Sequence, residues 1–173
     1  MNFRHLLAKY RIDKLRTMQL PELALQGLME GMESESLVIL AGMSKYDSAF
    51  EIQEYFEKSL IELKIDLPDK RQAAIIFALG LIEEIENGEL DIIKGIYKIK
   101  NTAIDSYDFI DESDKFCYDS IGFEIIYGLF DEYFEIKECG DKWNEEKKEK
   151  LSEKIKSDLL TELLKWKEIM DRH

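Results

Sequence analysis

Residues 73–82 read Ala-Ala-Ile-Ile-Phe-Ala-Leu-Gly-Leu-Ile, ten consecutive positions without a charged side chain. Asp69 stands three residues before Gln72, which is the spacing of a helix N-cap, and Asn87-Gly88 has the chemistry of a helix C-terminus. A helix that is apolar on every face must be surrounded by other elements of the fold. The run is too short to cross a bilayer, which takes about 20 residues. We therefore predict a buried central helix near 69–87 in a soluble helical domain.

Seven further helices are placed by apolar periodicity, by capping residues and by glycine or proline stops. They cover residues 2–16, 21–32, 37–41, 47–67, 91–102, 115–136 and 144–170, and residues 103–114 form a connection. The alternation typical of strands is not convincing anywhere, and no repeat of fixed period occurs. The sequence thus predicts an all-α fold, a single compact domain over residues 1–173 with about eight helices.

Several of these helices have specific start signals. Ser34 or Ser36 is expected to cap the helix at 37–41. Ser48 and Glu51 have the spacing of a capping box at the start of the next helix.

Gly27 and Gly31 lie four residues apart in the helix at 21–32. We expect them to let a neighbouring element approach closely.

The chain carries a formal net charge of -13, which is distributed unevenly. Residues 1–20 have five basic and one acidic side chain, whereas residues 101–140 have two basic and eleven acidic ones, a net charge of -9. Such a chain repels the phosphates of nucleic acids, so no nucleic acid is expected as a partner and a basic protein is compatible. The basic amphipathic helix at 2–16 could lie on a membrane surface. We favour an ordinary packed terminal helix.

The compartment is inferred from what the sequence lacks. The N-terminal apolar run is too short for a signal peptide, and nothing else is long enough to span a membrane. Cys117 and Cys139 are isolated and have no CxxC spacing. We expect a cytoplasmic protein without a disulfide and without a membrane as its partner.

The usual motifs of catalysis are missing from the sequence. Neither GxGxxG nor GxxxxGK[ST] occurs. The two histidines, His5 and His173, are not preceded by a glutamate at three residues, as the di-iron pattern requires. We expect His5 to be exposed or half-packed, and Cys117 to be a small buried hydrophobe rather than a nucleophile. We therefore predict no catalytic residue, metal or cofactor, and an enzyme that uses only Glu and Asp is the least favoured alternative.

The helix predicted at 115–136 has the most informative polar pattern. Its aromatic stripe recurs at steps of three and four residues, at Phe116, Ser120, Phe123, Tyr127, Phe130 and Phe134. Tyr118 falls in a second apolar arc, and Glu124, Asp131 and Glu135 form a narrow acidic ridge between the two. In the simpler interpretation the stripe is core and the ridge is merely solvated. Our functional hypothesis makes Tyr118 and the ridge a protein-binding patch, because interface anchors are often aromatic and complementary charge gives selectivity.

A motif precedes this region, since residues 31–42 read Gly-Met-Glu-Ser-Glu-Ser-Leu-Val-Ile-Leu-Ala-Gly, of the form G-x-x-S-x-x-L-x-x-L-A-G. It resembles an opening found in a group of uncharacterised small acidic bacterial proteins. The likeness continues through 50–63 and 85–99. Such proteins are similar to those found beside polymorphic toxins, some of which are thought to be immunity proteins. The motif is structural in character and brings no catalytic residue, and this sequence has Ile92 where the family pattern often has proline after Asp91.

Two hypotheses of function from different classes follow. The first is a non-enzymatic cytoplasmic binding protein, for which the resemblance implies an immunity protein that neutralises a bacterial toxin by occluding a basic toxin domain. The alternative is a structural or regulatory helical protein that self-associates as a homo-oligomer without a toxin partner. A large secreted toxin encoded immediately upstream would favour the first.

Overall fold

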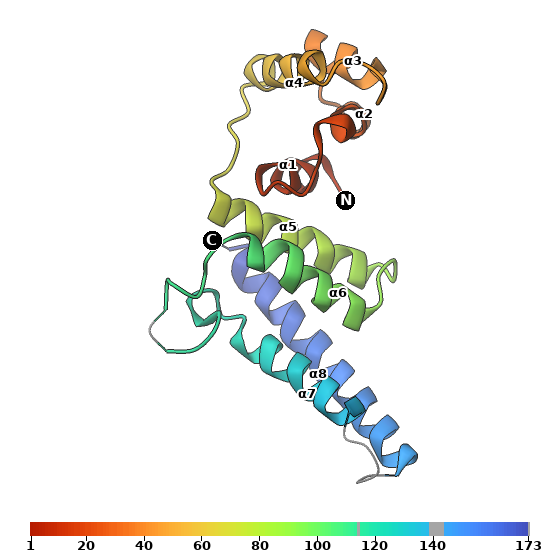
Figure 1. Cartoon of the computed structure of the whole chain (residues 1–173), viewed down its shortest axis with the longest axis vertical. Helices are drawn as coiled ribbons and strands as arrows, with labels where there is room; N and C mark the ends of the chain where they lie inside the picture. Colours follow the sequence, from red (N-terminus) through yellow and green to blue (C-terminus); the bar gives the residue numbers. More distant parts are fainter. Residues whose placement is uncertain (114, 139–143, 173) are drawn as a thin grey trace. The chain divides into compact units, whose positions relative to one another are not determined.

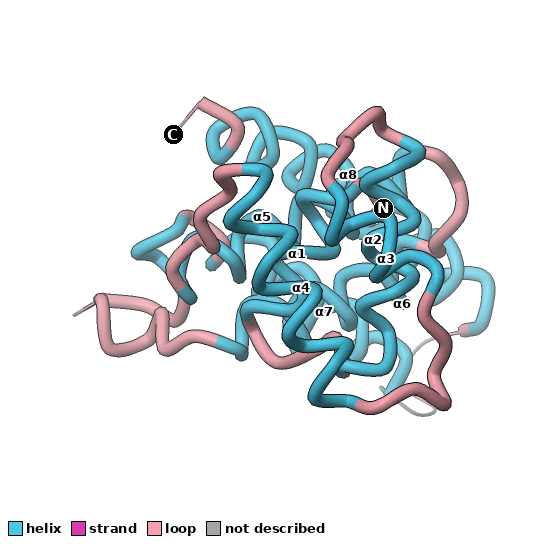
Figure 2. The backbone as a smooth tube through the Cα atoms, turned by 90° about the horizontal axis from the view of Figure 1, so that it is seen from above, coloured by secondary structure: helices cyan, strands magenta, loops and turns pink. Residues whose placement is uncertain are grey.

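The computed structural model describes residues 1–113, 115–138 and 144–172, and these contain eight α-helices and no strand (Figure 2). The all-α prediction is therefore confirmed. The helices are α1 (Phe3–Arg11), α2 (Leu20–Met29), α3 (Glu35–Gly42), α4 (Ala49–Leu63), α5 (Lys70–Glu86), α6 (Ile92–Lys98), α7 (Glu124–Glu138) and α8 (Glu145–Met170). The chain divides into two compact units, Met1–Gly80 and Leu81–His173, so the expectation of a single domain stays a prediction.

In the first unit, α2 packs against α1 and α3, and α3 packs against α4 (Figure 1). Pro21 lies in the first turn of α2, where its missing N–H costs no hydrogen bond. The buried cluster between these helices includes Phe3, Leu7, Leu20, Leu23, Leu37, Leu40, Ile52 and Phe56. The apolar periodicity of the sequence therefore becomes one core shared by four helices.

The start of α3 is fixed by the hydrogen bonds of two serines, Ser34 and Ser36. Ser34 is the N-cap, and its Oγ accepts a hydrogen bond from the Leu37 N–H at 3.1 Å. Ser36 is buried and donates its Oγ–H to Glu62 of α4 at 2.6 Å, and its backbone N–H also donates to Glu62 at 3.0 Å. These hydrogen bonds lower the pKa of Glu62 below its ordinary value. Ser48 precedes α4 but makes no side-chain capping bond, so the capping box predicted there is absent.

Gly27 and Gly31 have different structural roles, although the sequence predicts a close approach of a neighbouring element at both. A Cβ added at Gly27 would lie 2.8 Å from the ring of Phe3, so this glycine does allow a close approach. Gly31 has no neighbour within 4 Å of such a Cβ, but its φ is +84°. It terminates α2 in the left-handed conformation, which side chains disfavour by about 1–2 kcal/mol.

Gly27→Ala should destabilise the protein, because the Phe3 ring that would have to move is itself buried in the core. Overpacking of this kind costs about 1–3 kcal/mol, more than the roughly 1 kcal/mol that alanine gains over glycine inside a helix. Urea unfolding of the variant should show a lower midpoint. Gly42→Ala is the matched control, since a Cβ there meets nothing within 4 Å and the midpoint should stay or rise. A lowered midpoint in the control alone would contradict this account.

α5 is buried around its circumference, as the apolar run predicts. Its residues 77–82 are all buried. The side chain of Asp69 accepts a hydrogen bond from the Gln72 N–H at 2.8 Å, which confirms the cap. In the first unit the His5 ring packs on Gly80, where a Cβ would lie 2.6 Å from the ring. His5 is only 5% exposed, so the expectation of an exposed or half-packed histidine is wrong.

α1 and α4 each end near a left-handed residue, before the end that the sequence predicts. α1 ends at Arg11 rather than 16, and α4 ends at Leu63 rather than 67. The residues that terminate them, Asp13 and Lys64, have φ of 61° and 55°. A left-handed residue turns the chain out of the helix, and here neither is the glycine that usually marks such an end.

In the second unit α7 and α8 pack along each other (Figure 1). Asp91 caps α6 by accepting hydrogen bonds from the N–H groups of Ile93 and Lys94, each at 3.1 Å. α6 continues as a π-helical turn, Ile99–Ala103, and a 3-10 turn, Ile104–Ser106. The largest buried side chains of the unit include Leu81, Ile82, Ile96, Phe109 and Phe123. Nowhere in the described parts of the chain does a helix combine the length and apolarity needed to span a membrane.

Candidate protein-binding surface

The helix predicted at 115–136 begins nine residues later than expected, at Glu124. Residues before it form a turn that contains the short 3-10 helix Asp119–Ile121. Tyr118 and Gly122 flank this helix with φ of 65° and 68°, and the Phe123 N–H donates to the Tyr118 carbonyl at 3.0 Å. Two left-handed residues so close together cannot continue an α-helix. The first residues of the predicted aromatic stripe therefore lie in a turn and not in a helix.

Tyr118 is not an exposed anchor residue, because only 6% of it is exposed. Its hydroxyl donates to the Asp105 carboxylate at 2.8 Å, and the ammonium of Lys100 lies 3.2 Å from the other oxygen of that carboxylate. The Tyr118 ring meets the Tyr127 ring edge-on at 5.4 Å, and the Lys100 ammonium lies 5.6 Å from the centre of the Tyr127 ring. This cluster ties the segment after α6 to the start of α7. Tyr118 is thus a buried core residue, and its place in the second apolar arc does not make it accessible to a partner.

Burial first, and the Asp105 carboxylate second, raise the pKa of the Tyr118 hydroxyl above its ordinary value of 10.0. A phenol whose pKa is raised by folding stabilises the protein fully below pH 10 and loses that contribution as the pH rises above it. We predict that the free energy of unfolding falls above pH 10 and that Tyr118→Phe reduces the steepness of this fall. The measurement is urea unfolding at several alkaline pH values. Equal steepness in both proteins would contradict the raised pKa.

The predicted ridge is only partly exposed. Asp131 and Glu135 lie on the outer side of α7, whereas Glu124 is half-buried. Its Oε2 is buried without a hydrogen-bond partner among the described residues. α7 buries Ile126, Phe130 and Ile136. The helix thus has one buried side and a broad outer side, instead of the two apolar arcs with a narrow ridge that the wheel predicted.

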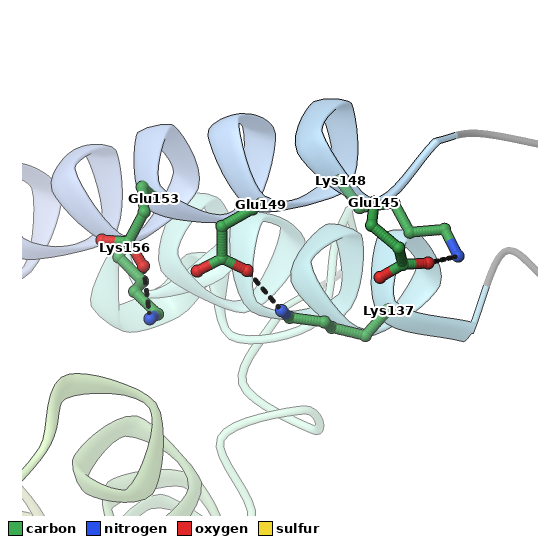
Figure 3. A network of polar contacts seen from close by, with 6 residues as sticks. All are labelled: Lys137, Glu145, Lys148, Glu149, Glu153 and Lys156. Carbon is green, nitrogen blue, oxygen red and sulfur yellow. Dashed lines mark hydrogen bonds and ion pairs between the residues drawn. The ribbon is translucent and has the colours of Figure 1, made fainter.

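Two further carboxylates that the sequence analysis did not select, Glu132 and Glu138, are also exposed on α7. We define the acidic face of α7 as Asp131, Glu132, Glu135 and Glu138. No ion pair within the described residues joins any of these four to a lysine or arginine. Lys137, the one base of α7, instead reaches Glu149 of α8 at 3.4 Å (Figure 3). Among the described residues, no ion pair therefore compensates the negative charge of the acidic face.

Two apolar side chains stand beside this charge. Ile125 is 55% exposed and Phe134 is 39% exposed. The Phe134 ring is held edge-on by Phe130 at 5.0 Å and by Tyr133 at 5.5 Å. A partly exposed aromatic side chain with fixed neighbours loses little freedom on binding. Phe134, which the sequence placed with the core stripe, is thus better suited as an anchor than Tyr118.

The reactive side chains of the described residues do not gather into a metal site. Within the described residues, no group of three His, Cys, Asp or Glu side chains could hold a metal ion. Cys117 is exposed in the turn before α7, so the expectation of a buried hydrophobe is wrong. Cys139 and His173 lie outside the described residues.

No protein-family model, curated protein or solved structure matches this chain. The resemblance of residues 31–42 to uncharacterised small acidic bacterial proteins, and the immunity role that it implies, therefore stay predictions. The structure accounts for the motif by folding alone: Gly31 has a positive φ, Ser34 caps α3, and Leu37 and Leu40 are fully buried. Function is accordingly inferred from the exposed side chains.

Proposed function

We propose that this chain is a non-enzymatic protein-binding protein that receives a basic partner on the acidic face of α7. The observation that carries the proposal is four exposed carboxylates on one short helix, with no cation paired to them among the described residues. Unpaired charges of one sign raise the rate of encounter with an oppositely charged surface. The exposed Phe134 supplies the apolar contact that charge alone does not give.

The biological role we propose is neutralisation of a basic toxin domain by occlusion, in the cytoplasm. It is supported by the resemblance of residues 31–42 to bacterial proteins found beside toxins, and by the net charge of -9 over residues 101–140. Occlusion needs a rigid surface of complementary charge and no catalytic group. Packing against α8 holds α7 in place, and the acidic face of α7 supplies the charge.

Self-association through the same face is the less favoured alternative. In a two-fold symmetric dimer the same patch meets its own copy. The four carboxylates of one acidic face would then oppose those of the other, and like charges placed together are unfavourable. A partner of different chemistry avoids this repulsion.

The triple change Glu132→Lys, Glu135→Lys and Glu138→Lys tests the interface. Each side chain is exposed, so each change should alter the free energy of unfolding by about 0.5 kcal/mol or less. Association with the partner should slow by roughly tenfold or more at low salt, because peripheral charges act mainly on the association rate. The partner is obtained by affinity capture with the wild-type chain from its source cell, identified by mass spectrometry, and measured by surface plasmon resonance.

The matched control is Asp66→Lys, Glu89→Lys and Glu168→Lys. These positions are exposed, and the control changes the net charge by the same amount without touching α7. Glu124 is left out because it is half-buried and its substitution would disturb folding. The proposal fails if both triple variants bind the partner equally fast.

The toxin role has a separate test in cells. Expression of the captured partner alone should arrest growth, and co-expression of the wild-type chain should restore it. The α7 triple variant should restore growth much less than the control triple variant. A partner that is harmless when expressed alone would remove the toxin role and leave the binding role intact.

A further inference from the structure

A second surface of unusual composition lies on α2 and α3, in the first unit. Four apolar side chains are exposed there: Leu25 at 52%, Met29 at 75%, Val38 at 56% and Ile39 at 39%. We call these the α2–α3 patch. Val38 and Ile39 also line an open groove of about 610 Å³, together with Leu28, Glu33, Ser34 and Glu35. The groove is thus lined by three apolar side chains, two carboxylates and one serine hydroxyl.

The segment that carries this patch, residues 17–44, has charged side chains of only one sign. Residues 17–44 contain four acidic side chains, Glu22, Glu30, Glu33 and Glu35, and no lysine or arginine. All four are exposed. No ion pair within the described residues involves any of them. The negative field at the groove is therefore not cancelled by its own helices.

The packing of α3 does not depend on the exposed side chains Val38 and Ile39. α3 is anchored on its other side by Leu37 and Leu40, which are fully buried, and at its start by Ser34 and Glu62. Exposed apolar groups that cluster on one surface of a protein mark contact sites more often than isolated ones do. Met29 adds an unbranched side chain that can adapt to different shapes.

We propose that the α2–α3 patch binds a basic amphipathic helix of a partner protein. Apolar residues at helical spacing on the partner would enter the groove between Leu28, Val38 and Ile39, in the helix-in-groove mode of recognition. Lysine or arginine residues beside that stripe would face Glu33 and Glu35. A second copy of this chain is a poorer occupant, because its equivalent surface is also acidic. This inference does not depend on the acidic face of α7 being an interface.

The test uses a synthetic helical peptide with leucine at positions i, i+3, i+4 and i+7 and lysine at the others, labelled with a fluorophore. Its binding to the full chain is followed by fluorescence anisotropy, beside a matched peptide in which glutamate replaces every lysine. The lysine peptide should bind and the glutamate peptide should not. Binding should weaken as salt is raised, since the charges involved are exposed.

Two variants of the chain locate the site. Met29→Ser with Val38→Ser should weaken binding of the lysine peptide by about tenfold or more, as loss of apolar anchors does. Glu33→Gln with Glu35→Gln should reduce its salt dependence. Phe50→Ser on α4 is the control, since Phe50 is 77% exposed but belongs neither to the α2–α3 patch nor to the lining of the groove. Far-UV circular dichroism and the urea midpoint verify that each variant is folded.

The acidic face of α7 must be separated from this surface. Glu132→Lys with Glu135→Lys and Glu138→Lys should bind the lysine peptide as the wild type does. Loss of binding in this variant, with binding retained by Met29→Ser/Val38→Ser, would overturn the inference by assigning the peptide to α7. Equal binding of both peptides, no binding of either, or a change in the oligomeric state of the chain alone on substitution of Met29 and Val38 would overturn it too.

Discussion

A helix that has no polar side cannot face water, and α5 imposes this constraint on the chain. Burying one large aliphatic or aromatic side chain contributes about 1.5–3 kcal/mol, and the buried run at 77–82 contains several. In the first unit the His5 ring of α1 packs against Gly80 of α5. In the second unit α6 packs the backbone of Gly95 against Ile85, near the end of α5. Both close approaches rely on a glycine, because a Cβ would meet the neighbouring side chain.

The parts of the fold that the sequence predicts well are those governed by local chemistry. Side chains of Ser34, Asp69, Asp91 and Asn144 each accept a hydrogen bond from a backbone N–H in the first turn of a helix, at or near the predicted start. The errors lie at helix ends, where Asp13 and Lys64 adopt a left-handed conformation that their residue types do not announce. The largest error is that a helix was predicted over 115–123, where the chain forms a turn. Gly122 could have indicated the turn, but the aromatic residues at steps of three and four favoured a helix.

The candidate surface could be predicted only in part, because the aromatic pattern did not indicate the turn before α7. Asp131 and Glu135 are exposed, because a helix does run through them, and their role in binding stays a prediction. Tyr118 and Glu124 were misjudged because they lie in or next to the turn, where the helical wheel gives no valid direction. Glu132, Glu138 and Phe134 were missed because the wheel assumed two apolar arcs. With one buried side against α8, the outer side of α7 is broad enough to include them.

The number of charges on a surface does not decide whether it attracts a partner, as α8 demonstrates. Residues 141–173 contain nine acidic and nine basic side chains, and within α8 the pairs Glu145–Lys148 and Glu153–Lys156 close at 2.9 and 2.7 Å (Figure 3). Each pair contributes at most about 1 kcal/mol to stability. Because the opposite charges are adjacent, their fields cancel over a short distance. Within the described parts of the chain, the acidic face of α7 and the carboxylates of residues 17–44 have no cation paired with them. Their field therefore extends over the roughly 8–10 Å that physiological salt allows. Long-range attraction of a basic partner can therefore arise at these two surfaces, and α8, although more highly charged, adds almost nothing to it.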